Sequence, residues 1–213
     1  MPFFKIAVFV SGGGTNLQAI IDRINDDSLS GVSIAGVIAS RAGTFAEQRA
    51  AKAQLPFKIV NRRDYSDLAA YDKAILDALA PWQPDLIVLA GFLSLLGPAV
   101  IAAYRNRIIN IHPSLIPSFC GPGLYGIRPH QAALDYGVKV SGATVHVVDE
   151  HYDQGPIVMQ KAVEVWPDDT PQTLQLRIMQ EAEQIILPQA IALFAAGRVR
   201  IKGRRAIIEE ANL

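Results

Sequence analysis

The chain has 213 residues, of which 50% are hydrophobic and 19% are charged, an ordinary composition for a globular protein. Its 20 Lys and Arg residues balance 20 Asp and Glu residues, so there is no overall basic field to attract nucleic acid or an acidic membrane surface. The single cysteine, Cys120, excludes an internal disulfide framework, and the longest apolar runs are far too short to span a bilayer. The first residues lead directly into a strand pattern without the layout of a signal peptide. We therefore expect a cytoplasmic enzyme with no nucleic-acid or membrane partner.

The first half of the chain alternates between strand and helix patterns. Short apolar runs predict buried strands at residues 5–10, 32–39, 57–60, 85–90 and 107–112. Helical patterns, several of them closed by proline, predict helices at residues 17–24, 45–54, 68–79 and 95–104. This alternation predicts an α/β fold with a right-handed, doubly wound parallel sheet.

The pattern changes after Pro117. A Gly- and Pro-rich loop at 118–129 is followed by a short helix at 130–134 and by two strands, 140–148 and 156–165, that are close enough to pair as an antiparallel hairpin. Residues 170–196 predict a long helical stretch interrupted at Pro188, and residues 197–201 an edge strand before a fraying tail. We expect one domain, 1–213, whose two halves are residues 1–105 and 106–200.

A glycine turn at residues 11–16 joins the first strand to the first helix. Backbone N–H groups and the helix dipole make such a turn suitable for binding phosphate. Leu17 replaces the third glycine of the dinucleotide fingerprint, and the Gly-Lys-Ser/Thr of a Walker loop is missing. From these residues alone, a plain tight turn is an equally good interpretation.

Two polar side chains stand where the fifth strand ends. Asn110 and His112 point to the same side if the strand is still extended there, and Pro113 stops the ladder. Ligands bind at the carboxyl ends of strands in open α/β sheets. Downstream, an acidic loop offers Asp153 as a carboxylate that could meet His112, and Asp149 and Glu150 compete with it. Taken singly, Asn110 would be a turn cap and His112 a hydrogen-bonded strand-end histidine.

The motifs Asn-x-His-Pro-Ser-Leu from Asn110, Thr-Val-His ending at His146, and Asp-x-Gly-Pro from Asp153 together resemble the folate-dependent formyltransferases. Ser-Gly-Gly-Gly-Thr-Asn-Leu-Gln from Ser11 is similar to the phosphate loop of the members that formylate glycinamide ribonucleotide in purine biosynthesis. The resemblance extends over residues 5–199 and implies their Rossmann-like fold.

The resemblance also implies roles for individual residues. Formyl transfer passes through an oxyanion, which the Asn110 amide and a charged His112 can stabilise while Asp153 orients His112 and accepts a proton. His146 would support this geometry, although a mid-strand histidine by itself is usually a hydrogen-bonded core residue. The ribonucleotide phosphate is assigned to Gly14, Thr15, Asn16, Gln180 and Glu183. The folate site is assigned to Leu93, Ser94, Leu95, Leu96, Val148, Asp149 and Asp153.

The implied co-substrate is 10-formyltetrahydrofolate, the acceptor is glycinamide ribonucleotide, and no metal is needed. We expect a monomer or a weak homodimer. Ser94 departs from the family, whose members often carry a basic residue there, and Leu93, Leu95 and Leu96 would otherwise be ordinary core residues.

Three other functions are compatible with parts of the pattern. A formyltetrahydrofolate hydrolase shares the Asn-x-His and Asp motifs but uses water as acceptor. It typically carries an extra N-terminal domain, and we expect none here because the first predicted strand starts at Lys5. A methionyl-tRNA formyltransferase would need a further, basic C-terminal domain. A folate- or nucleotide-binding module would leave the arrangement of Asn110, His112 and Asp153 unexplained.

Overall fold

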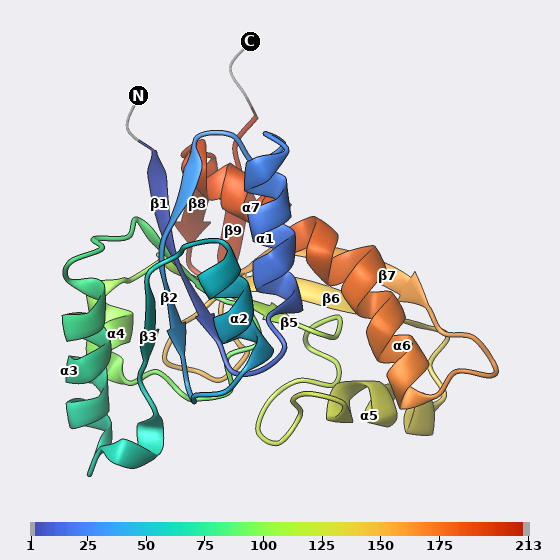
Figure 1. Cartoon of the computed structure of the whole chain (residues 1–213). Helices are drawn as coiled ribbons and strands as arrows, with labels where there is room; N and C mark the ends of the chain where they lie inside the picture. The colour runs from blue at the N-terminus through green and yellow to red at the C-terminus, as the bar shows by residue number, and fades with distance from the viewer. Residues whose placement is uncertain (1–2, 211–213) are drawn as a thin grey trace. The chain divides into compact units, whose positions relative to one another are not determined.

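The computed structural model describes residues 3–210 (Figure 1). The chain divides into two compact units, residues 1–109 and 110–213. The division falls inside strand β5 (Ile108–His112), so that Asn110 and His112 belong to the second unit. Within the described residues, every helix is too short or too polar to cross a membrane.

The first unit is a parallel sheet with helices on both faces. Its elements are β1 (Phe4–Val10), α1 (Thr15–Asn25), β2 (Val32–Ala39), α2 (Phe45–Lys52), β3 (Phe57–Ile59), the 3-10 turn η1 (Arg62–Asp64), α3 (Leu68–Leu79), β4 (Leu86–Leu89) and α4 (Pro98–Ala103). The strand order is β3-β2-β1-β4, and β1 pairs in parallel with both β2 and β4. From β1 the chain adds β2 and β3 on one side, and it then returns to add β4 on the other side of β1. Right-handed crossovers in these opposite directions place α3 on the face of the sheet opposite α1 and α2 (Figure 1). The predicted doubly wound parallel sheet is confirmed.

Local sequence explains where these elements begin. The strands β1 and β4 are apolar runs whose residues 6–10 and 86–89 are buried, as expected for strands covered on both faces. Thr44 caps α2 by accepting the N–H of Glu47, and Asp67 caps α3 by accepting that of Ala70. Side-chain oxygens thus satisfy backbone donors that no helical carbonyl can reach.

Helix α4 is shorter than predicted. It begins at Pro98 instead of Leu95, and Gly97 before it is extended. Proline favours the first helical position because its missing N–H is not needed there and its φ is already helical. The residues 93–96 therefore lie in a loop between β4 and α4.

The second unit is built on an antiparallel hairpin. Its elements after β5 are α5 (Arg128–Tyr136), β6 (Val140–Val147), β7 (Ile157–Glu164), α6 (Pro171–Ile178), the π-turn η2 (Met179–Glu183), α7 (Gln184–Ala195), β8 (Val199–Lys202) and β9 (Arg205–Ile208). The predicted pairing of β6 with β7 is confirmed, with Thr144 opposite Gln160 and a register shift between Val145 and His146. Helix α5 is longer than the predicted 130–134 and ends at Gly137, whose φ is 81°.

The long C-terminal helical stretch is present, but its interruption lies elsewhere than predicted. Pro188 sits inside α7, which continues to Ala195. Pro188 lacks the N–H that would bond to the carbonyl of Gln184, and the helix nevertheless continues past it. The interruption is instead the wider turn η2, where the N–H of Gln184 bonds to the carbonyl of Met179.

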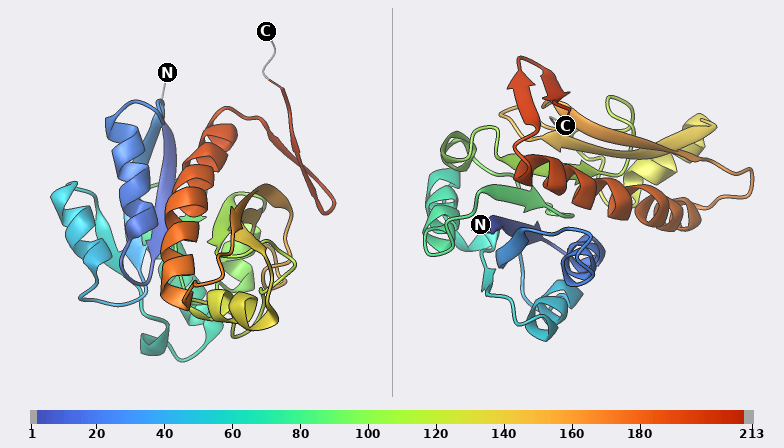
Figure 2. Two further views of the ribbon diagram at one scale, coloured as in Figure 1. Left: turned by 90° about the vertical axis from the view of Figure 1, so that its right-hand side faces the viewer. Right: turned by 90° about the horizontal axis from the view of Figure 1, so that it is seen from above.

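Sequence analysis missed one strand. The tail does not fray after residue 201: β8 and β9 pair antiparallel as a hairpin beyond the end of α7 (Figure 2). Only Gly203 and Arg204 separate the two strands, and the φ of Gly203 is +59°. A glycine two-residue turn between short apolar runs is a recognised hairpin signal that could have predicted it.

Candidate active site

His112 ends strand β5 and is buried, with 5% of its surface exposed. Its Nε2 lies 3.1 Å from the carbonyl oxygen of Phe119. A carbonyl can only accept, so Nε2 carries a proton and donates it. Nδ1 then faces the carboxylate of Asp153, whose Oδ2 is 3.6 Å away. The ring is thus fixed in one orientation, with its second nitrogen toward a carboxylate.

His146 lies on β6 beside Asn110, and its two ring nitrogens have different roles. Nδ1 is 3.1 Å from the carbonyl oxygen of Val147 and therefore donates. Nε2 is 3.1 Å from Nδ2 of Asn110. Burial lowers the pKa of His146, which favours the neutral ring. In that tautomer Nε2 accepts an amide hydrogen, so His146 orients the Asn110 side chain.

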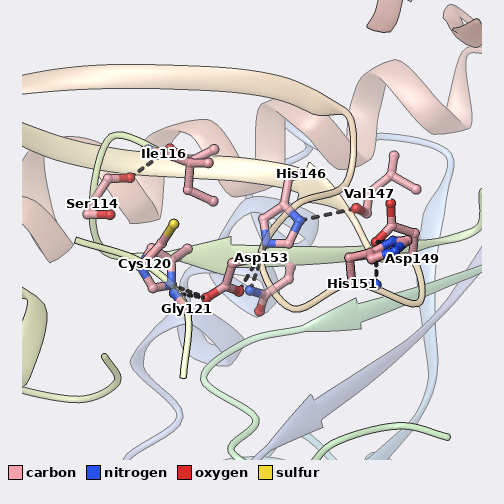
Figure 3. A network of polar contacts seen from close by, with 12 residues as sticks. Ser114, Ile116, Cys120, Gly121, His146, Val147, Asp149, His151 and Asp153 are labelled. Atoms are coloured by element: carbon pink, nitrogen blue, oxygen red, sulfur yellow. Dashed lines mark hydrogen bonds and ion pairs between the residues drawn. The ribbon is translucent and has the colours of Figure 1, made fainter. Parts of the chain in front are cut away.

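Asp153 faces both His112 and His146, and Figure 3 shows its carboxylate beside the ring of His146. Its Oδ1 is 3.7 Å from Nε2 of His146, and its Oδ2 accepts the backbone N–H of Gly121 at 3.0 Å. The φ of Asp153 is +54°, a conformation that few non-glycine residues adopt. Asp149, its competitor in the same loop, bonds instead to the N–H of His151 and faces that ring.

The loop after His112 is held by two residues that sequence analysis missed. Oγ1 of Thr144 donates to the carbonyl of Ser114 at 2.6 Å and accepts the N–H of Ile116 at 3.1 Å. Nε2 of Gln160 donates to the carbonyl of Ile116 at 3.0 Å. These bonds fix the segment that leads to Phe119, the partner of His112. Thr144 could have been found, since it is two residues from His146 and faces the same side of β6; Gln160 depends on the register of the hairpin.

The glycine turn of the first unit has the geometry of a helix N-terminus. Gly14 caps α1 in the left-handed region, with φ 67°, and a Cβ there would lie 2.8 Å from Cβ of Ala46. Thr15 and Asn16 form the first turn of α1, whose N–H groups have no helical acceptor. Helix geometry therefore directs several donors to one place, which suits an anion.

Arg49 supports this turn and was not predicted. Its Nε donates to the carbonyl of Gly13 at 2.9 Å, and its Nη1 donates to Gln18 at 3.0 Å. A cation thereby stands beside the turn and adds to the positive potential of the helix N-terminus. The predicted fold alone could have indicated that a residue of α2 lies near this turn, because α2 follows β2 and packs beside α1 in a doubly wound sheet.

The remaining predicted residues occupy both units. In the first, Leu93 and Leu95 are 58% and 61% exposed, so these two are not core residues. Ser94 and Leu96 between and after them are half-buried. In the second unit, Val148 and Asp149 are half-buried at the end of β6, and Gln180 and Glu183 lie in the π-turn η2, which sequence analysis had placed in regular helix.

Two further groups near His112 are held uncharged. His130 on α5 is 1% exposed; burial, and then the neighbouring charge of His112, lowers its pKa to about 4. Burial, and then Asp153, raises the pKa of the Cys120 thiol, so this cysteine is not an activated nucleophile. Among residues 3–210, no group of three or more His, Cys, Asp and Glu side chains could hold a metal ion.

Comparison with known proteins identifies the family of this chain. The model of the formyl transferase family matches residues 4–191. This chain belongs to the formyl transferase family. The resemblance seen in its motifs is thereby confirmed over most of the sequence.

Relatives within the formyl transferase family are similar over nearly the whole chain. The phosphoribosylglycinamide formyltransferase of Haemophilus influenzae is 38% identical over 205 residues, which are 96% of this chain and 93% of that protein. The trifunctional purine biosynthetic protein adenosine-3 of Bos taurus is 40% identical over 197 residues, or 92% of this chain. The chain spans only 14–19% of the length of such trifunctional relatives.

Solved structures show the same fold. Glycinamide ribonucleotide transformylase 1 from Symbiobacterium toebii has a TM-score of 0.91 at 40% identity, with 98% of this chain and 95% of that one covered. A formyltetrahydrofolate deformylase from Pseudomonas syringae pv. tomato has a TM-score of 0.86 at 25% identity, and 98% of this chain and 66% of that one are covered.

Proposed function

We propose that this chain transfers the formyl group of 10-formyltetrahydrofolate to the amino group of glycinamide ribonucleotide, a step of purine biosynthesis. The observation that carries the proposal is the buried group of Asn110, His112, His146 and Asp153, in a chain whose relatives are named for this reaction. It combines an oriented amide, an imidazole and a carboxylate, which are the groups that acyl transfer between nitrogens requires.

The first task of the site is to stabilise an oxyanion. When the amine nitrogen bonds to the formyl carbon, the carbonyl electron pair moves to oxygen. One hydrogen of the Asn110 amide is directed to His146, so the other is the donor for this oxygen. We assign His112, whose ring is held by the carbonyl of Phe119, as a second group that stabilises this oxygen.

The second task is proton transfer. The attacking amine must lose a proton, and the folate nitrogen that leaves must gain one as its bond to carbon breaks. Asp153 can accept the first proton, directly or through water, and its Oδ2 faces Nδ1 of His112. The 3.6 Å separation between Nδ1 and Oδ2 is longer than a hydrogen bond, as is common for catalytic pairs before substrate binds.

The two substrates are proposed to bind to different residues. We assign the ribonucleotide phosphate to Gly14, Thr15 and Asn16 at the start of α1, with Gln180 and Glu183 as further contacts. We assign the folate to Leu93, Ser94, Leu95 and Leu96 in the first unit and to Val148, Asp149 and Asp153 in the second. The exposed side chains of Leu93 and Leu95 are apolar, which suits the flat face of a pterin ring.

A formyltetrahydrofolate hydrolase is the second candidate, because a deformylase has the same fold at 25% identity. One assay separates the two functions. The full chain is given 10-formyltetrahydrofolate, and release of tetrahydrofolate is followed with and without glycinamide ribonucleotide. We expect release to require the ribonucleotide and to match the amount of formylated product. Equal release with water alone would favour the hydrolase, and the variant Asn110→Ala controls for uncatalysed breakdown.

We further propose a cytoplasmic location and a monomeric or weakly dimeric state. The single cysteine, which allows no internal disulfide and fits a reducing compartment, supports the first. Light scattering over a range of protein concentrations tests the second, since a weak dimer dissociates on dilution.

A further inference from the structure

Ser11 links two segments that the proposed function gives to different substrates. It is the first residue of the glycine turn and is 4% exposed. Its Oγ accepts the backbone N–H of Leu93 at 2.9 Å, and its own N–H donates to the carbonyl of Gly91 at 3.1 Å. Ser11, in the proposed phosphate turn, is therefore bonded once to residues 93–96, which are proposed to bind folate, and once to Gly91 just before them.

Further bonds keep Ser11 from moving independently. Oγ of Ser40, at the end of β2, donates to Oγ of Ser11 at 2.7 Å, and Nε of Arg41 donates to the carbonyl of Ser11 at 3.0 Å. A hydroxyl oxygen has two acceptor positions, and Leu93 and Ser40 occupy both. The side chain of Ser11 thus has one orientation, set by three segments of the first unit.

The far end of the folate segment is anchored separately. The buried carboxylate of Asp72 accepts the N–H of Gly97 at 2.7 Å and that of Ala99 at 2.9 Å. A Cβ on Gly97 would lie 2.4 Å from Oδ2 of Asp72, so only glycine fits there. Phe92, before this segment, packs its ring against Phe9, and residue 97, after it, is fixed by α3. Between these two fixed points, the hydroxyl of Ser11 holds the N–H of Leu93.

We propose that Ser11 is a positioning residue that couples the two substrate sites. This inference rests on the proposed function. A phosphate held by the N–H groups after Ser11 restrains the backbone of the turn, and the Ser11 hydroxyl passes that restraint to Leu93. Folate then binds to a segment that is already ordered, and by thermodynamic linkage folate raises the affinity for the ribonucleotide by the same factor.

The test measures the coupling directly, with ligands that cannot react. Titration calorimetry gives the Kd of tetrahydrofolate, which lacks a formyl group, with and without saturating glycinamide ribonucleotide. In the wild-type protein we expect the ribonucleotide to tighten folate binding by about 5-fold or more, the lower end of typical couplings. In Ser11→Ala we expect the ratio of the two Kd values, without and with ribonucleotide, to fall to about 1, while each ligand alone still binds.

Two variants make the result specific. Ser40→Ala removes a serine hydroxyl from the same cluster but keeps the Ser11–Leu93 bond, so its ratio should stay at the wild-type value. Ser11→Cys keeps the size of the side chain with a weaker acceptor and should behave like Ser11→Ala, which separates lost hydrogen bonding from a packing defect. If the ratio of the tetrahydrofolate Kd values without and with ribonucleotide were equal in Ser11→Ala and wild type, the coupling role of Ser11 would be overturned. A ratio of 1 in wild type would also overturn it, and neither result would affect the proposed function. No binding of either ligand to wild type would overturn the proposed function as well.

Discussion

Nδ2 of Asn110 lies 3.1 Å from Nε2 of His146, and this contact determines which way the amide of Asn110 faces. Because Nδ1 of His146 donates to the carbonyl of Val147, Nε2 bears the lone pair and must accept from the amide. A buried neutral histidine thus aims the group that is proposed to stabilise the oxyanion.

Replacing His146 by Phe keeps a ring of similar size but removes the acceptor. We expect kcat to fall by about 2–10-fold, the value of one neutral hydrogen bond, with little change in either KM. The added loss from Asn110→Ala should then be smaller than in wild type, because the amide is already misoriented. His151→Phe, at a side chain 71% exposed, is the matched control and should leave kcat unchanged. Independent, multiplicative losses would show that His146 does not act through Asn110.

Asn110→Ala should affect the transition state more than binding. Loss of one oxyanion donor lowers kcat by about 10²–10³ in known cases. We expect a loss of that order, with the Kd values of tetrahydrofolate and glycinamide ribonucleotide nearly unchanged by calorimetry. If folate binding disappeared while single-turnover chemistry remained fast, Asn110 would only position the substrate.

Asp153 and His112 should act as one unit, because the carboxylate faces Nδ1 of the ring. Asp153→Asn keeps the shape but removes the charge, and we expect kcat to fall by about 10²-fold or more. The double variant with His112→Ala should lose much less than the product of the two single losses. Asp77→Asn, at an exposed carboxylate on α3, is the control and should leave kcat unchanged. A strictly multiplicative double variant would contradict the pairing.

Asn16→Ala should weaken ribonucleotide binding selectively. Asn16 lies buried in the first turn of α1, where the phosphate is proposed to bind. Loss of a hydrogen bond to a charged group costs roughly 1.5–3 kcal/mol, so the ribonucleotide KM should rise by more than tenfold. The KM for folate is the internal control and should change little. An unchanged ribonucleotide KM would remove Asn16 from the site.

His130 should make the protein less stable in acid. Its pKa is lowered from 6.5 to about 4 by burial, so between these values the unfolded chain binds a proton that the folded protein does not. The free energy of unfolding therefore falls as pH drops from 6.5 toward 4, by about 3 kcal/mol from this residue. Urea unfolding at pH 7 and pH 4.5 should show this loss in wild type and a smaller one in His130→Leu. The variant His151→Leu should retain the wild-type dependence, and an unchanged pH dependence in His130→Leu would refute the assignment.

The sequence by itself determined the order of strands and helices in the first unit and the family. Short apolar runs such as residues 5–10 and 85–90, closed by glycine or proline, are local signals that tertiary contacts did not override. The predictions that failed concern features that local sequence signals do not specify. The π-turn at Met179–Glu183 and the start of α4 depend on how neighbouring turns bond and pack. Asn110, His112, His146 and Asp153 were found as motifs, and Asp153 was expected to meet His112, but the atoms that face one another were not predicted.

Only the tertiary structure decided which atoms of distant residues meet. The tautomers of His112 and His146 are set by the carbonyls of Phe119 and Val147, and no spacing in the sequence specifies a ring orientation. The bond between Ser11 and Leu93 joins residues 82 positions apart. Such contacts follow from strand register and from the way buried polar groups must find partners once water is excluded, and these conditions exist only in the folded chain.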